Sequence, residues 1–249
     1  MMTLDANMLE VDTTPVPGSG DALNVFGLSL SVMSDEEARA REEQELQEEA
    51  ERKREKLLTH YRSDKSGVPE RYKSESLSTF KPWCDSAEYA LQRVWDFVKS
   101  KESRVLILCG GVGLGKTHLG CGVIRERGGV YRSIPRLMYE IDGTMSFKAS
   151  ETKIQLLDRL CYSPMLVLDE IGRTRIREES QIEIVSYIVS ERYANKKPTV
   201  LISNFTKEAL CKWLGLSVFD RLLEVGETVT LQGESYRKFK REKDNERHA

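Results

Sequence analysis

A short apolar run that leads directly into a glycine-rich loop constrains this sequence more than any other feature. Val105 to Cys109 is continuously hydrophobic and short enough for a buried parallel strand. It runs into Gly110-Gly111-Val112-Gly113-Leu114-Gly115-Lys116-Thr117, which matches the pattern G-x-x-x-x-G-K-[ST], and a helical stretch follows from Lys116. A strand, a glycine-rich loop and a helix in this order predict a phosphate-binding loop.

The residue types of this loop suit the binding of a nucleotide phosphate. Glycines let the backbone wrap so that successive N–H groups face the phosphate, and the following helix adds its positive end. Lys116 supplies a charge to the β- and γ-phosphates, and the hydroxyl of Thr117 is a ligand for Mg²⁺. We therefore predict that residues 110–117 bind ATP with Mg²⁺. A glycine-rich turn with an incidental lysine is the alternative.

Polar residues follow two further apolar runs. Met165 to Leu168 is followed by Asp169 and Glu170, and Thr199 to Ser203 is followed by Asn204. With the phosphate loop present, Asp169 is expected to hold Mg²⁺ and Glu170 to orient or deprotonate the attacking water. Asn204 is placed to sense the γ-phosphate. Alone, the two carboxylates would fit a surface loop or a helix cap, and Asn204 would fit a turn.

Strands and helices alternate along this part of the chain. An amphipathic helix over Trp83 to Lys101 precedes the first strand, and the alternation points to an α/β domain with helices on both faces of a mostly parallel sheet. The further strands are expected at Val130–Ser133, Met165–Leu168, Thr199–Ser203 and Thr228–Leu231, and the further helices from Lys116 and at Pro135–Ile141, Lys153–Cys161, Ile182–Ala194 and Lys207–Trp213.

The amino-terminal part has a different composition. Residues 1–33 are predicted to be disordered, and residues 34–75 to form a charged helical arm followed by a linker from Ser63 to Pro82. Ser34 and Glu37 fit a capping box. This arm is either a solvated helix or a docking element for another protein, with Leu46, Leu57, Leu58 and Tyr61 as contacts.

Composition bounds the class of protein. The chain has 249 residues, 31% of them charged, with a net charge of −2 and five widely spaced cysteines. The near-neutral charge argues against binding to nucleic acid by bulk electrostatics. We find no apolar stretch of about 20 residues, as a membrane span needs, and no signal peptide. A soluble, reduced protein of the cytoplasm is expected.

The order of these motifs resembles the AAA+ ATPases, and among them the DnaC/DnaI helicase loaders and the related IstB transposition ATPases. The resemblance runs from about Val68 to Arg237 and implies an AAA+ P-loop fold over residues 76–237 without a C-terminal helical lid. It rests on residues 110–117, Val167–Gly172, Pro198–Asn204, Phe219-Asp220-Arg221 and Ser235-Tyr236-Arg237.

The resemblance also implies roles for two arginines. Arg221 matches the arginine finger that completes a neighbouring subunit's ATP site, and Arg237 matches the sensor-2 position. Arg192 is a weaker candidate for a contact across the subunit boundary. Arg221 and Arg237 also fit ordinary surface salt bridges. The loaders often carry a second arginine shortly before the finger, and here Gly215-Leu216-Ser217 stands in its place.

The segment between Pro135 and Lys153 corresponds to the loader insertion that lines the DNA channel. Here Phe147 and Lys148 either contact single-stranded DNA, by stacking and by phosphate binding, or Phe147 packs the excursion onto the domain. Residues 238–249 form a tail of basic and acidic residues that is expected to be solvated, with contact to DNA as the alternative.

The resemblance thus predicts an ATPase that loads a hexameric, DnaB-like replicative helicase onto single-stranded DNA and self-associates through ATP-bridged interfaces. The alternatives are a transposase-assisting ATPase of the IstB kind, a small-molecule kinase, and an adaptor that binds nucleotide without hydrolysing it.

Overall fold

The computed structural model describes residues 22–25, 28–31, 35–100, 102 and 104–246. The chain forms two compact units that divide between Arg52 and Lys53. The first unit contains an antiparallel pair of strands, β1 (Ala22–Val25) and β2 (Leu28–Ser31), and the greater part of helix α1 (Asp35–Arg62). Most of the region that we predict to be disordered, residues 1–33, lies outside the described residues.

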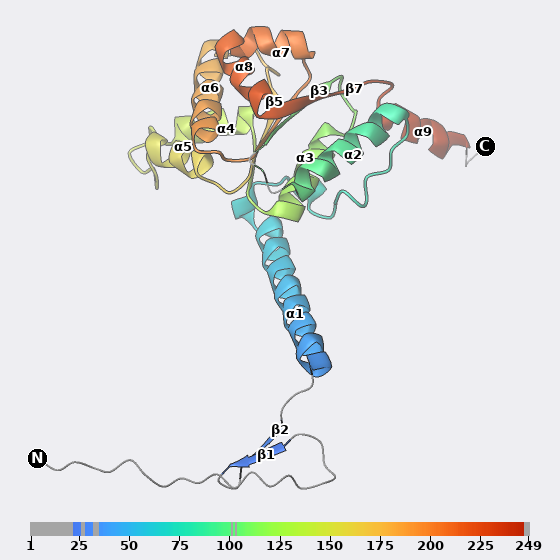
Figure 1. The fold of residues 1–249 in the computed structure, drawn as a ribbon. Helices are drawn as coiled ribbons and strands as arrows, with labels where there is room; N and C mark the ends of the chain where they lie inside the picture. Colours follow the sequence, from blue (N-terminus) through green and yellow to red (C-terminus); the bar gives the residue numbers. More distant parts are fainter. Residues whose placement is uncertain (1–21, 26–27, 32–34, 101, 103, 247–249) are drawn as a thin grey trace, which may run out of the picture. The chain divides into compact units, whose positions relative to one another are not determined.

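A five-stranded parallel sheet forms the centre of the second unit (Figure 1). The strand order is β4-β5-β6-β3-β7, and every neighbouring pair is parallel. The predicted α/β architecture with its parallel sheet is confirmed, although β5 continues past Leu168 and β7 begins before Thr228. The strands are β3 (Val105–Gly110), β4 (Val130–Ser133), β5 (Leu166–Ile171), β6 (Thr199–Ser203) and β7 (Gly226–Leu231).

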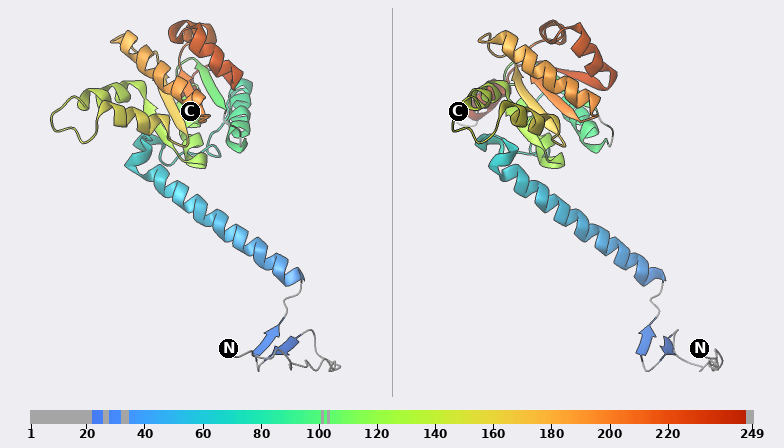
Figure 2. Two further views of the ribbon diagram at one scale, coloured as in Figure 1. Left: turned by 60° about the vertical axis from the view of Figure 1, so that its left-hand side comes forward. Right: turned by 90° about the vertical axis from the view of Figure 1, so that its left-hand side faces the viewer.

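Helices cover both faces of this sheet, and Figure 2 shows the layers from two further sides. Helices α2 and α3 pack on one face, whereas α4, α5 and α6 pack on the other with α7 and α8. The helices are α2 (Asp85–Lys99), α3 (Lys116–Arg127), α4 (Ile134–Gly143), α5 (Lys153–Cys161), α6 (Glu178–Ala194), α7 (Lys207–Leu214), α8 (Leu216–Glu224) and α9 (Tyr236–Glu246).

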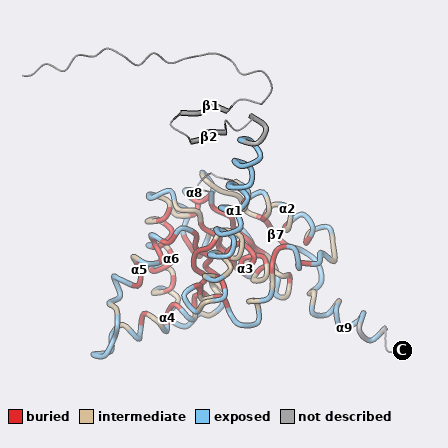
Figure 3. The backbone as a smooth tube through the Cα atoms, turned by 90° about the horizontal axis from the view of Figure 1, so that it is seen from below, coloured by how far each residue is buried: buried red, intermediate tan, exposed pale blue. Residues whose placement is uncertain are grey.

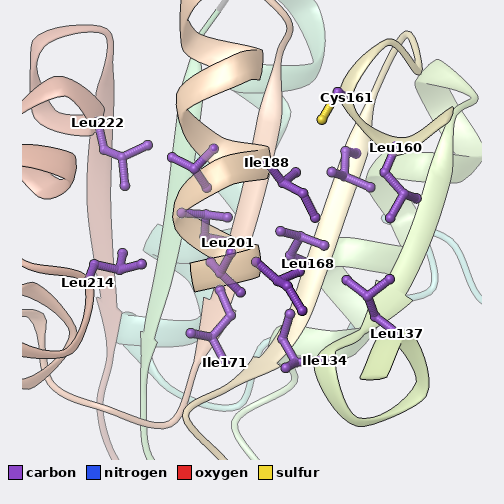
Figure 4. Close-up of a cluster of buried hydrophobic side chains, with 14 of the residues drawn as sticks. Ile134, Leu137, Leu160, Cys161, Leu168, Ile171, Ile188, Leu201, Leu214 and Leu222 are labelled. Atoms are coloured by element: carbon purple, nitrogen blue, oxygen red, sulfur yellow. The ribbon is translucent and has the colours of Figure 1, made fainter. Parts of the chain in front are cut away.

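The alternation of side chains along each strand produces two separate cores. In β3, Ile107 and Cys109 belong to the core under α4 to α8, whereas Leu106 and Leu108 belong to the core under α2 and α3. Figure 4 shows part of the first core, where side chains of α4, α5, α6 and α8 meet those of β5 and β6. A strand that is buried on both faces needs a continuous apolar run, and β3, β5 and β6 each contain one.

The segment before α2 is part of the second core, so the predicted linker from Ser63 to Pro82 is wrong. Val68, Leu77 and Phe80 are buried, and a Cβ atom on Gly122 of α3 would lie 2.4 Å from the side chain of Leu77. Tyr61, near the end of α1, is fully buried and is therefore not available for docking another protein. Two short helical turns, η1 (Asp64–Ser66) and η2 (Glu70–Tyr72), lie within this segment.

Two helices appear where the sequence predicted none. Helix α8 buries Phe219 and Leu222, and helix α9 occupies the predicted tail and is largely exposed, as Figure 3 shows by its pale colour. Within the described ranges, no helix combines the length and the apolar character that crossing a membrane requires.

Candidate nucleotide-binding site

The loop between β3 and α3 has the backbone geometry of a phosphate cradle. Gly110, Gly113 and Gly115 have positive φ angles of 123°, 83° and 79°, a region that side chains with a Cβ atom rarely adopt. Gly115 is the N-cap of α3, so the positive end of this helix faces the loop. Gly113 is also confined from outside, because an added Cβ atom would lie 2.1 Å from Ser235 Oγ.

Lys116 begins α3 beneath this loop. Its side chain donates hydrogen bonds from Nζ to the carbonyl oxygens of Gly110 at 2.7 Å and Gly111 at 2.6 Å. Only 5% of the residue is exposed, and this burial lowers the pKa of Lys116 from 10.5 to about 8, against an opposing effect of the charge of Asp169. The structure therefore holds a desolvated cation against the glycine-rich loop.

Thr117 and Asp169 meet although 52 residues separate them in the sequence. Thr117 Oγ1 donates to Asp169 Oδ2 at 2.7 Å, and Tyr131 Oη of β4 donates to the same oxygen at 2.8 Å. Burial raises the pKa of Asp169 above 3.8, while these hydrogen bonds and the one from the Glu170 N–H act in the opposite direction. A hydroxyl and a carboxylate oxygen are hard donors of the kind that Mg²⁺ takes together with nucleotide phosphates, so these two residues fit that ion.

A bulge in β5 sets the position of Glu170. The pairing with β6 steps from Leu168 to Ile171 on one strand but only from Leu201 to Ser203 on the other, and Glu170 has a positive φ of 60°. This conformation is unusual for a residue with a side chain. The Glu170 N–H donates to Asp169 Oδ1 at 2.6 Å, and the Glu170 carboxylate accepts a hydrogen bond from Arg173 Nη1.

Asn204 lies at the end of β6, between the strands that carry the two motifs. Its neighbours are fixed on both sides, because Ser203 Oγ donates to Ile171 O at 2.8 Å and the Gly110 N–H donates to Phe205 O at 3.3 Å. Asn204 itself is exposed. The structure thus places Asn204 at the edge of the sheet where residues 110–117, Asp169 and Glu170 also lie.

The chain returns to the phosphate loop after β7. The Tyr236 N–H donates to Gly113 O at 3.0 Å, and Trp83 Nε1 donates to Glu234 O at 3.0 Å. The rings of Trp83 and Tyr236 lie 4.9 Å apart, next to the ring of Phe80, which approaches Gly115. Arg237 follows directly in the first turn of α9 and is exposed. This segment therefore brings Arg237 to the neighbourhood of the loop.

Three candidates from the sequence lie outside this site. Arg221 is exposed on α8. Phe147 is fully exposed, at 107%, and Lys148 beside it is also exposed, so the alternative that Phe147 packs the excursion onto the domain is wrong.

The prediction for Arg192 is also wrong, because this residue is not at the surface. Its exposed fraction is 1%, and its guanidinium donates to the carbonyl oxygens of Leu160 at 2.7 Å and Pro198 at 2.6 Å. Burial lowers the pKa of Arg192 to about 10. Arg192 joins the end of α5 to the start of β6 and cannot reach a neighbouring subunit.

Sequence reasoning missed Tyr131 and Arg173. Nothing in the run Val130–Ser133 marks Tyr131 as part of a site. The strand register offers the signal: Tyr131 pairs with Val167, two residues before Asp169, so the side chains of Tyr131 and Asp169 lie on the same face of the sheet. Arg173 follows Glu170 by three residues, within reach across one turn.

The second unit is a parallel α/β/α sandwich with a phosphate loop after β3, the carboxylates Asp169 and Glu170 near the end of β5, and the polar residue Asn204 after β6. This combination defines an AAA+ P-loop ATP-binding protein. The chain belongs to the family of IstB-like ATP-binding proteins, whose model matches residues 36–244.

Comparison with individual proteins supports this family assignment. The replicative helicase loader DnaC of Escherichia coli K12 is 30% identical over 169 residues, which cover 64% of this chain and 67% of the loader. An ATP-binding protein of insertion sequence IS21 from Pseudomonas aeruginosa is 28% identical, over 64% of this chain and 61% of that protein. The resemblance to the DnaC/DnaI and IstB proteins that we inferred from the motifs is confirmed.

Solved structures share the fold. The crystal structure of the DnaC helicase loader matches with a TM-score of 0.58 and 26% identity, over 66% of this chain and all of that one. The replication initiator DnaA, solved with AMPPCP and single-stranded DNA, matches with a TM-score of 0.55 over 67% of this chain and 51% of that one; at 18% identity this likeness concerns the fold alone.

Proposed function

We propose that this chain is an ATPase that loads a hexameric replicative helicase onto single-stranded DNA. The observation that carries the proposal is the hydrogen bond of 2.7 Å between Thr117 and Asp169, with Glu170 next in the chain. It joins the phosphate loop to the carboxylates that hydrolysis requires. The relative named as a helicase loader supports the finer assignment.

Each residue then has a role in ATP turnover. The amides of residues 110–117 and the ammonium of Lys116 bind the phosphates, and Thr117 and Asp169 hold Mg²⁺, which neutralises charge on the phosphate oxygens when bound. Glu170 orients the attacking water and accepts its proton. Asn204 contacts the γ-phosphate from the end of β6, and Arg237 contacts the nucleotide from α9.

The ATP site is completed by a second copy of the chain. In this proposal Arg221 of one copy reaches the γ-phosphate bound to its neighbour, so that ATP favours a self-associated state and hydrolysis releases it. An exposed arginine on a well-packed helix suits this role, because the side chain is free to enter another subunit's site. Phe147 and Lys148, both exposed, are proposed to contact single-stranded DNA.

The amino-terminal arm is the proposed helicase contact. Between residues 38 and 56 of α1 every residue is exposed, and Leu46, with an exposed fraction of 60%, is the large apolar side chain of this stretch. Since Tyr61 is buried, we centre the proposed contact on Leu46. Replacing Leu46 with Asp should weaken helicase capture at least about tenfold, as loss of a well-packed interface residue does, whereas Gln47→Asp, beside it, should not.

Co-purification tests the function directly. The full-length protein is mixed with hexameric replicative helicases with and without ATP, and the complexes are weighed by native mass spectrometry. We expect an ATP-dependent complex that persists in Glu170→Gln, whose turnover should fall about 100-fold or more. Absence of any helicase complex, with strong binding to duplex DNA and a steep salt dependence, would instead assign the chain to transposition.

A role in transposition is the main alternative to helicase loading, because the IS21 relative belongs with the same family of ATP-binding proteins. A phosphorylated small molecule among the reaction products would instead identify a kinase. Equally slow turnover by the wild type and Glu170→Gln would identify a nucleotide-binding adaptor.

A further inference from the structure

The ring of Phe80 restrains the glycine-rich loop from outside. Glycine has more conformational freedom than any other residue, so a loop that contains several glycines depends on its surroundings for a defined shape. At Gly115, the last glycine of the loop, an added Cβ atom would lie 2.6 Å from Phe80 Cε2 and 3.1 Å from Phe80 Cζ. Phe80 is 6% exposed. A buried ring thus lies directly against the end of the loop.

His118 packs against this ring. The rings of Phe80 and His118 meet edge to face, with their centroids 5.2 Å apart and their planes at 87°. His118 follows Thr117 on α3, and its side chain is 18% exposed. Because consecutive side chains on a helix point in different directions, His118 faces Phe80 while Thr117 Oγ1 faces Asp169.

The imidazole of His118 is itself held by the chain before α2. Its Nε2 lies 2.8 Å from Ser76 O, and since a carbonyl oxygen only accepts, this nitrogen carries the hydrogen. Thr79 Oγ1 lies 3.4 Å and Glu75 Oε2 lies 3.7 Å from the same nitrogen. Ser76 and Thr79 close a turn, because the N–H of each donates to the hydroxyl oxygen of the other, at 2.9 and 3.1 Å. His118 is therefore bound to a well-defined turn.

One face of α3 carries all of these contacts. His118, Gly122 and Arg125 follow one another at a spacing of four and three residues, which places them in a row along the helix. Leu77 packs beside Gly122, and Arg125 Nη1 donates to Glu75 O at 3.1 Å. Within this row, His118 lies nearest to the glycine-rich loop.

We propose that His118 is a positioning residue of the nucleotide site: it fixes Phe80 against Gly115 and so holds the loop in the shape that the phosphates of ATP require. This inference rests on the proposed function and adds to it a residue that the sequence motifs do not mark. A loop that is already ordered loses less conformational entropy when its ligand binds. Removing the side chain of His118 should therefore weaken the binding of ATP.

The kinetic signature of this role differs from that of a catalytic group. The loop amides bind the phosphates both in the ground state and in the transition state, and a change in such uniform binding alters KM but not kcat. Loss of the ordered loop should therefore raise the KM and the Kd for ATP and leave kcat unchanged. A merely structural role of His118 would lower stability without changing either constant.

Replacing His118 with Leu removes the ring and the hydrogen bond but keeps a side chain of similar bulk. The full-length His118→Leu protein should bind ATP with Mg²⁺ about three- to tenfold more weakly, the effect of losing one hydrogen bond, as measured by calorimetry. Its kcat at saturating ATP should equal that of the wild type. His118→Gln should recover part of the affinity, because its planar amide packs against Phe80 and its N–H reaches Ser76 O.

His60→Leu is the matched control. His60 Nε2 also lies close to a carbonyl oxygen, that of Gly129 at 2.7 Å, but beyond the C-terminal end of α3 and away from the loop. Its replacement should lower the free energy of unfolding in urea and leave the Kd for ATP unchanged. Equal weakening of ATP binding in His60→Leu and His118→Leu would overturn the inference, because a general loss of stability would then explain both.

A double-mutant cycle tests whether His118 acts through Phe80. Phe80→Leu removes the ring, keeps an apolar side chain in the core, and should weaken ATP binding by a similar factor. In that background His118→Leu should have no further effect on the Kd. A full additional loss would overturn the role of Phe80 as the link. Phe80→Leu also tests the inference by itself if His118→Leu does not fold, since wild-type affinity in Phe80→Leu would contradict it.

The outcomes separate this inference from the proposed function. His118→Leu protein that binds ATP as the wild type does, or that has a lower kcat at an unchanged KM, overturns the positioning role and leaves the loader function standing. Wild-type protein that does not bind ATP with Mg²⁺ overturns the proposed function itself, and this inference with it.

Discussion

The hydroxyl of Tyr131 donates a hydrogen bond of 2.8 Å to Oδ2 of Asp169, a carboxylate that is 3% exposed. Tyr131 lies on β4 and Asp169 on the adjacent β5, so the sheet itself holds this pair in register. The same oxygen accepts from Thr117. Tyr131 thus helps to keep the proposed metal-binding carboxylate ionised in a buried place, without touching the nucleotide loop.

Replacing Tyr131 with Phe should therefore affect Asp169, although Tyr131 does not contact the nucleotide loop. Loss of a hydrogen bond to a buried carboxylate is expected to lower the free energy of unfolding by about 1–2 kcal/mol and to raise the pKa of Asp169 further. Urea unfolding and the Mg²⁺ dependence of ATP binding measure the two effects. Tyr193→Phe is the control, because Tyr193 donates to Glu224 at the exposed surface. Equal, small effects of both variants would contradict this role.

Asp169→Asn should separate stability from function. Burial raises the folded-state pKa of Asp169 above its ordinary value of 3.8, so ionisation of Asp169 lowers the free energy of unfolding. This loss of stability is absent below the unfolded-state pKa, grows as the pH rises to the folded-state pKa, and is complete above it. The variant should thus be more stable than the wild type at about pH 7, with the difference shrinking toward about pH 4, and should lose Mg²⁺-dependent ATP binding. Asp220→Asn, at an exposed position, should show no such pH dependence. A variant that is less stable at every pH would contradict this account.

Lys116 should take up protons when ATP binds. Its pKa of about 8 in the nucleotide-free protein reflects burial, and triphosphate oxygens near the ammonium should raise that pKa. Binding near pH 8 therefore draws protons from the buffer, whereas binding near pH 6.5 draws fewer at this group. Calorimetry in two buffers of different ionisation enthalpy measures the uptake. Lys116→Arg retains a charge that does not titrate here, so its uptake near pH 8 should vanish; unchanged uptake would place the titrating group elsewhere.

The sheet, and the position of the polar residues at its edge, could be predicted from the sequence for one physical reason. Strands buried on both faces must be apolar throughout, so β3, β5 and β6 are marked by their composition, and the polar residues that follow them necessarily gather where parallel strands end. Residues 110–117, Asp169 and Asn204 are placed in this way.

Other features depend on pairings that the sequence does not encode locally. The hydrogen-bond partner of Asp169 on β4 is Tyr131, and the register of β4 against β5 sets this pairing. The buried position of Arg192 depends on free carbonyl groups at the end of α5. The segment around Val68 and Leu77 has too few apolar residues to show periodicity, yet both side chains are buried and Leu77 lies against Gly122 of α3.

Tyr61 offers a test of that packing. Its ring is fully buried and its hydroxyl donates to Tyr72 O at 2.5 Å, so Tyr61→Ala should lower the free energy of unfolding by about 3–5 kcal/mol, and Tyr61→Phe by about 1 kcal/mol. Leu46→Ala, at an exposed position of the same helix, should change it by less than about 0.5 kcal/mol. Chemical denaturation of the three variants provides the measurement. A Tyr61→Ala protein as stable as the wild type would mean that this segment does not belong to the core.

Arg221 should contribute to ATP turnover only when copies of the chain assemble. Its neighbours Phe219 and Leu222 anchor α8 in the core while Arg221 itself is exposed, so Arg221→Ala should retain its stability and its affinity for ATP. Turnover in the assembled complex should fall about 10³-fold, the effect of removing an arginine finger. Lys212→Ala, an exposed cation on α7, serves as the control. Mixing Arg221→Ala with Lys116→Ala should restore part of the turnover, because the first variant supplies intact nucleotide loops and the second supplies arginines. Mixed assemblies as inactive as either parent would show that Arg221 does not act across the interface.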